Sequence, residues 1–166
     1  MRKGDAWCIV PFDDMARFDL SLQLTSDKKT ILEALDAVAQ ANPSGGTAMG
    51  DGMFYALAVL LEDSMPVRDG VRGEIDLERL RKEVAKPIVE GRVPDMPYVQ
   101  GLVRLVGVQK HAFVVIETDA DYNPGIADPL MLLEVFARFG IHVYILGIGF
   151  DYGTYPDIVQ AVRRTG

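Results

Sequence analysis

The sequence contains one cysteine and two histidines among its 166 residues. A lone cysteine excludes an intrachain disulfide and a cysteine-rich zinc site. Cys8 has apolar neighbours, which favours a strand thiol over a nucleophile. His111 and His142 flank predicted strands without a spaced partner histidine or glutamate, so solvated or core positions are favoured over metal binding. Thiolate and imidazole metal sites are therefore not expected.

A basic cluster and a long apolar run are also absent. The net charge of −7 and the lack of a lysine and arginine stripe argue against a nucleic-acid surface and against an anionic membrane face. No apolar run approaches the ~18 residues of a membrane span, and the first residues lack the apolar stretch of a signal peptide. With 49% hydrophobic residues, the chain as written is predicted to be soluble and to form a single domain over 1–166.

The first third of the chain predicts a hairpin followed by two helices. Residues 6–12 indicate a buried strand, and 15–24 alternate weakly as a second strand after a turn at Asp13-Asp14. Ser26 or Asp27 caps a helix that stops at Asn42-Pro43. The next helix, 48–61, is apolar on more than one side, which predicts burial against several neighbours. The apolar face of the first helix comprises Ile31, Leu32, Leu35, Val38 and Ala39.

The remainder alternates strands with helices. Two helices are predicted within the proline- and glycine-punctuated segment 62–110, at 75–86 and 98–106. The pattern then gives strands at 112–117 and 142–148. The helix between these strands begins at Asp128-Pro129 and closes at Gly140, and a last helix opens at Pro156. Alternating strands and helices predict an α/β fold with a mostly parallel sheet flanked by helices.

Oxygen-bearing side chains follow two of these elements. Asp119 and Asp121 come directly after an apolar strand, while the loop 43–52 opens a helix with Thr47 and Asp51. Ligands of open α/β sheets bind at the carboxyl ends of the strands. Hydroxyls, carboxylates and waters are the preferred ligands of hard divalent cations, so the two loops indicate a site for Mg²⁺ or Mn²⁺.

Simpler roles exist for the same residues. Thr47 is compatible with a helix N-cap as well as with a metal ligand. Asp51, one turn into the helix, needs no metal if it is solvated or stabilised by the helix dipole. Gly45 and Gly46 permit a tight left-handed turn, which also allows close approach to a ligand. Asp121 either offers a second carboxylate or faces water.

Three motifs, in this order, resemble those of von Willebrand factor A (VWA) domains. They are Ser44-Gly-Gly-Thr-Ala-Met-Gly-Asp51, Glu117-Thr-Asp119 and Gly140-Ile-His-Val-Tyr-Ile-Leu-Gly-Ile-Gly149. The closest likeness is to bacterial membrane-associated members, such as the aerotolerance (Bat) proteins and the VWA accessory proteins of methanol dehydrogenase operons. The resemblance covers 2–61 and 111–166 and makes 62–110 an atypical insertion. It implies a Rossmann-like sheet and a protein-interaction module rather than an enzyme.

Such domains carry a metal-ion-dependent adhesion site (MIDAS). The resemblance places Thr47 as the hydroxyl of its second loop and Asp119 as the carboxylate of its third. An ion held by so few charges takes an acidic side chain from a partner protein as a further ligand. Ala120 departs from the usual glycine and resists positive φ. Accessory positions of this site are Ser44, Gly46, Asp51 and Asp121.

The Asp-x-Ser-x-Ser loop of the family is absent from the chain, together with the first strand that carries it. Three of the five expected ligands are thus missing, and we expect weak metal binding or none. The sequence therefore reads as a fragment of a longer reading frame, favoured over a degenerate domain that has lost its metal. Because the missing strand is central in the family, its loss predicts an incomplete fold with unpaired edges, marginal stability and self-association.

The likeness to the bacterial members also implies a setting. It favours a membrane-anchored parent that faces the periplasm and works with a MoxR-type AAA+ ATPase, an analogy at the level of fold and operon. No residue of the chain identifies the partner protein.

Two enzyme classes compete with this interpretation. A haloacid-dehalogenase-like Mg²⁺-dependent phosphatase would use Asp119 as nucleophile and Asp121 as general acid. The next strand, however, lacks the required serine or threonine, and no later strand delivers an acidic pair. A response-regulator receiver would use Asp13-Asp14 and Asp119, but their spacing is too long and no lysine ends a later strand. A binding module is favoured over both.

Overall fold

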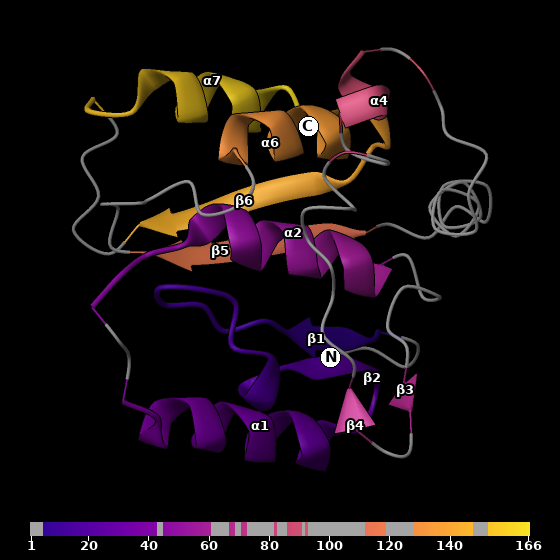
Figure 1. The fold of residues 1–166 in the computed structure, drawn as a ribbon, viewed down its shortest axis with the longest axis vertical. Coiled ribbons are helices and arrows are strands. Elements are labelled where there is room, and N and C mark those ends of the chain that lie inside the picture. The colour runs from indigo at the N-terminus through magenta and orange to yellow at the C-terminus, as the bar shows by residue number, and fades with distance from the viewer. Residues whose placement is uncertain are drawn as a thin grey trace.

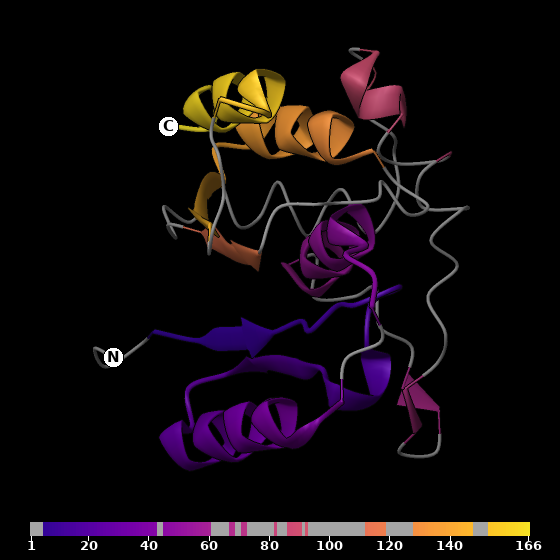
Figure 2. The same ribbon diagram turned by 90° about the vertical axis from the view of Figure 1, so that its left-hand side faces the viewer.

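A computed structural model describes residues 5–42, 45–60, 67–68, 71–72, 82, 86–90, 92, 112–118, 128–147 and 153–166. The helix predicted at 98–106 and all but two residues of the one predicted at 75–86 lie outside these ranges. The elements are stacked along the long axis of the molecule: α1 at one end, then β1 and β2, then α2 beside β5, then β6, and finally α6 and α7 (Figures 1 and 2).

An antiparallel hairpin forms the N-terminal unit. β1 (Trp7–Ile9) pairs with β2 (Leu22–Thr25), and an isolated bridge between Phe12 and Ala16 closes the predicted turn at Asp13-Asp14. The strand predicted over 15–24 is wrong in its first half, where the 3₁₀ helix η1 (Phe18–Leu20) lies instead. The carbonyl of Arg17 accepts hydrogen bonds from the Leu20 amide and the Ser21 hydroxyl, and these bonds turn the backbone out of the extended conformation.

Helix α1 (Lys28–Gln40) begins where the sequence predicts. The Asp27 carboxylate accepts hydrogen bonds from the amides of Lys29 and Thr30 at 3.2 and 3.3 Å, a standard N-cap. The Thr30 hydroxyl and these two amides lower the pKa of Asp27. The predicted apolar face is partly wrong, because Ile31 is buried whereas Leu32 and Leu35 are exposed. The helix packs against the hairpin on one side only. The part of its surface that is buried there is therefore narrower than its apolar face.

Helix α2 (Met49–Leu60) is the centre of the molecule. Every residue of the helix except Ala56 is buried. The helix contacts β1 and β2 on one side and β5 and α6 on the other. The prediction that it is surrounded by several neighbours is confirmed, and α2 thereby joins the two halves of the fold.

The C-terminal unit is a parallel strand pair with its crossover helix. β5 (Phe113–Thr118) and β6 (His142–Gly147) run in register from Phe113 opposite His142 to Thr118 opposite Gly147. Between them lies α6 (Pro129–Arg138), capped by Asp128 and closed by Gly140 in the left-handed region at φ 63°. Helix α7 (Pro156–Arg163) follows and packs on α6 and β6. This crossover confirms the predicted α/β class.

Three short elements complete the described chain: β3 (Val67–Arg68) and β4 (Val71–Arg72) pair antiparallel, and α4 (Lys86–Val89) contacts α6. A single apolar cluster runs through α2, α6, α7 and the inner face of β5 and β6. Among the described residues, no helix is both long and apolar enough to cross a membrane.

Candidate functional site

The candidate site lies on the side of the molecule where β5 and β6 finish and α2 starts. The arrowheads of both strands and the first turn of α2 point to the same side in Figure 1. β5 ends at Thr118, which is buried and immediately precedes Asp119 in the sequence. Of the predicted site residues, Thr47, Gly46 and Asp51 are described, whereas Ser44, Asp119 and Asp121 lie outside the described residues.

Thr47 stands just before α2 and is half-buried. The first turn of α2 closes on the carbonyl of Ala48, which accepts hydrogen bonds from the amides of Asp51 and Gly52 at 3.1 and 3.2 Å. The backbone cap position is therefore Ala48, one residue after Thr47. The side-chain cap and the ligand role of Thr47 both remain predictions.

Two loops that are distant in sequence meet here. The amide of Ala48 donates a hydrogen bond of 2.6 Å to the carbonyl of Asp13, in the turn of the N-terminal hairpin. A Cβ added to Gly46 would stand 1.9 Å from Oδ1 and 3.1 Å from Cα of Asp14. Gly46 is not among the positive-φ glycines of the described chain, so it is required for close approach rather than for a left-handed turn.

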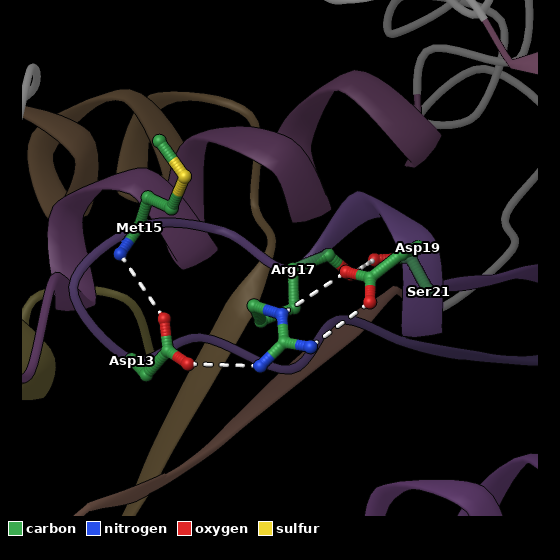
Figure 3. A network of polar contacts seen from close by, with 5 residues as sticks. All are labelled: Asp13, Met15, Arg17, Asp19 and Ser21. Atoms are coloured by element: carbon green, nitrogen blue, oxygen red, sulfur yellow. Dashed lines mark hydrogen bonds and ion pairs between the residues drawn. The ribbon is translucent and has the colours of Figure 1, made fainter. Parts of the chain in front are cut away.

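An ion-pair network fixes the same hairpin turn (Figure 3). The guanidinium of Arg17 donates to Asp13 Oδ2 at 3.0 Å and, through two nitrogens, to both carboxylate oxygens of Asp19 at 3.0 and 2.9 Å. Hydrogen bonds from Arg17 lower the pKa of Asp19, and the two carboxylates raise the pKa of Arg17. Asp13 is buried whereas the Asp19 side chain is 62% exposed. The network therefore anchors the turn from its buried end.

Asp51 is buried in the first turn of α2, with 3% of its surface exposed. It is therefore not the solvated carboxylate that one simple interpretation predicts. The positive end of the helix dipole favours an acidic side chain at this position. Within the described ranges, no buried side-chain nitrogen or oxygen lacks a hydrogen-bond partner, and no group of three or more His, Cys, Asp or Glu side chains is placed to hold a metal.

The remaining residues that the sequence raises as possible functional ones are the two histidines and the cysteine. The ring of His142 stacks on Phe113, with ring centres 5.6 Å apart. Cys8 is a half-buried thiol in β1, and burial raises its pKa, which disfavours the reactive thiolate. His111 lies outside the described residues.

The Gly46→Ala substitution is expected to destabilise the chain by about 1–2 kcal/mol, because the new methyl group must push aside the carboxylate of Asp14 and also crowds the Asp14 Cα, which loosens the contact between the two loops. The measurement is urea unfolding followed by circular dichroism. Gly45→Ala is the matched control, since a Cβ at Gly45 meets no atom within 4 Å. Equal effects of the two substitutions would contradict the close approach of the loops.

Comparison of the chain with protein-family models, curated proteins and solved structures found no match.

Proposed function

We propose that this chain is a protein-interaction module of the VWA type, with a Rossmann-like sheet and part of a metal-ion-dependent adhesion site. Thr47 and Asp119 hold Mg²⁺ or Mn²⁺ in this proposal, and Ser44, Gly46, Asp51 and Asp121 are accessory. The observation that carries it is the arrangement in Figure 1, in which the start of α2 lies on the same side of the molecule as the C-terminal ends of β5 and β6. In this proposal the hydroxyl and the carboxylate that flank these ends in the sequence share one region.

The donor chemistry fits a hard cation. A threonine hydroxyl and an aspartate carboxylate are oxygen ligands of the kind that Mg²⁺ and Mn²⁺ prefer. Two protein ligands leave most coordination positions to water, so the ion would be bound weakly and would have room for a carboxylate from a partner. The module binds in this way and performs no reaction.

The setting of the module is part of the same proposal. The resemblance to bacterial VWA proteins supports a membrane-associated complex at the periplasmic face, working with a MoxR-type AAA+ ATPase. The acidic group that completes the coordination would come from a protein of that complex.

Titration with Mn²⁺ while backbone amide NMR signals are monitored tests the site. We expect paramagnetic broadening of the amides at Thr47 and Ala48 and at Thr118, with a dissociation constant on the order of 1 mM, a value typical of weak oxygen sites. Thr47→Ala and Asp119→Asn should each weaken binding about fivefold or more, because each removes a direct ligand.

Asp157→Asn is the matched control, since Asp157 is an exposed carboxylate in the first turn of α7. Equal weakening by Asp157→Asn, or broadening that Thr47→Ala and Asp119→Asn leave unchanged, would refute the site. Mg²⁺-dependent turnover of an aryl phosphate that Asp119→Asn abolishes would instead favour the phosphatase alternative with Asp119 and Asp121.

A further inference from the structure

Among the described residues, the outer face of the β5–β6 pair presents apolar side chains that are about half exposed. Alternate residues of β5 are buried at Val114, Ile116 and Thr118, and Val114 and Ile116 belong to the apolar cluster of the core. The other alternate residues form two rows on the opposite face, paired across the strands in the observed register. The rows consist of Phe113, Val115 and Glu117 on β5 and of His142, Tyr144 and Leu146 on β6.

Four apolar side chains of this outer face are about half exposed: Phe113 at 54%, Val115 at 57%, Tyr144 at 52% and Leu146 at 55%. Parallel strands in α/β proteins are normally covered by helices on both faces. The largest apolar patch on the surface of a monomer, commonly a few hundred Å², is often a binding site. The outer face of β5 and β6 is therefore suited to pack against a second layer of helix.

We propose that the outer face of β5 and β6 docks an amphipathic helix of a partner protein. The rows run over five residues of β5, about 13 Å, and are separated by about 4.8 Å, the spacing of neighbouring strands. One apolar stripe of a helix covers that length in about two and a half turns. The two rows of side chains and the apolar stripe of such a helix thus have the same length.

The area of the patch disfavours a second copy of the chain. Half-exposed side chains of these sizes present roughly 400 Å² in total. A stable protein dimer needs about 800 Å² from each partner. Two copies stacked through this face alone would fall short, whereas a short helix buries an area of this size.

Charge specifies one end of the docked helix. Glu117 is exposed in the β5 row and lies opposite Leu146 of β6, at the C-terminal end of the two rows. It is the acidic residue of a surface that is otherwise aromatic or aliphatic apart from His142. A lysine or arginine at the corresponding end of the apolar stripe would complement it.

Fluorescence anisotropy with a labelled synthetic peptide tests this surface. The probe is an amphipathic helix of about 14 residues, or four turns, with a leucine stripe that ends in lysine, and a second peptide has glutamate in place of that lysine. The buffer contains EDTA, so the result is independent of the metal site proposed above. We expect saturable binding of the lysine peptide and about tenfold weaker binding to Leu146→Ser.

Glu117→Lys should reverse the preference between the two peptides, because it reverses the charge that selects them. Leu35→Ser is the matched control, since Leu35 on α1 is 48% exposed and lies outside this face. Absent binding, equal weakening by Leu35→Ser, or an unchanged peptide preference in Glu117→Lys would overturn the proposal. So would a dimer in sedimentation that Leu146→Ser dissociates, or protection of Phe113 and Tyr144 from oxidative footprinting in the chain alone.

Discussion

Phe54→Ala is expected to lower the free energy of unfolding by about 3–5 kcal/mol and the melting temperature with it. Phe54 is 1% exposed in α2, where its ring belongs to the apolar cluster that joins the N-terminal hairpin to the β5–β6 pair. Truncation of a buried phenylalanine removes its transfer free energy and leaves a cavity, at a cost of about 3–5 kcal/mol. Single domains are stable by only about 5–15 kcal/mol. Thermal and urea unfolding followed by circular dichroism measure the loss.

Phe113→Ala is the matched control for this prediction. It removes the same ring from a residue that is 54% exposed and whose ring contacts are with His142 and Tyr144 on the neighbouring strand. An exposed aromatic pair contributes about 0.5–1.5 kcal/mol, so this variant should remain folded. If Phe113→Ala proved as destabilising as Phe54→Ala, α2 would not be the centre of the core.

Local signals in the sequence predict much of the fold correctly. The Asp27 cap, the Asp128-Pro129 start and the Gly140 stop each act through backbone atoms within a few residues, so the sequence near each one determines it. The burial of α2 on all sides follows from an apolar composition that leaves no polar face.

Predictions that depend on tertiary neighbours were less successful. The weak alternation over 15–24 is compatible with a strand, but the hydrogen bonds from the Leu20 amide and the Ser21 hydroxyl to the carbonyl of Arg17 form a 3₁₀ turn there instead. On α1 the apolar residues cover a broader stripe than the hairpin can bury, which leaves Leu32 and Leu35 exposed. Periodicity indicates a face but does not give the extent of its partner.

The candidate site shows the same division. The loop at Gly46 and the turn at Asp13-Asp14 are each recognisable from sequence, but their contact is long-range, and no local pattern in the sequence indicates it. The burial of Asp51 likewise depends on the elements that surround α2. The approach of Thr47 to Asp119 remains a prediction, since Asp119 lies outside the described residues.

The second large effect is expected at the hairpin turn, where Asp13→Asn should destabilise the chain by about 1–3 kcal/mol. Asp13 is 5% exposed and accepts a hydrogen bond of 3.0 Å from Arg17. The substitution removes the negative charge that pairs with the guanidinium of Arg17. The amide nitrogen of asparagine also places a hydrogen-bond donor where the guanidinium needs an acceptor. Because the turn lies against Ala48, the loss should reach the start of α2. Amide hydrogen exchange of Ala48 and Met49 reports this local opening.

Asp19→Asn separates the buried ion pair from the exposed one. Asp19 contacts the same guanidinium at 2.9 and 3.0 Å, but its side chain is 62% exposed, so water replaces the lost interaction and the change should stay within about 0.5 kcal/mol. Exchange at Ala48 should then match the wild type. If the two variants lost stability equally, the burial of Asp13 would not be what anchors the turn. A loss confined to Asp13→Asn and accompanied by faster exchange at Ala48 would show that the hairpin turn holds the first turn of α2, and with it Thr47, in position.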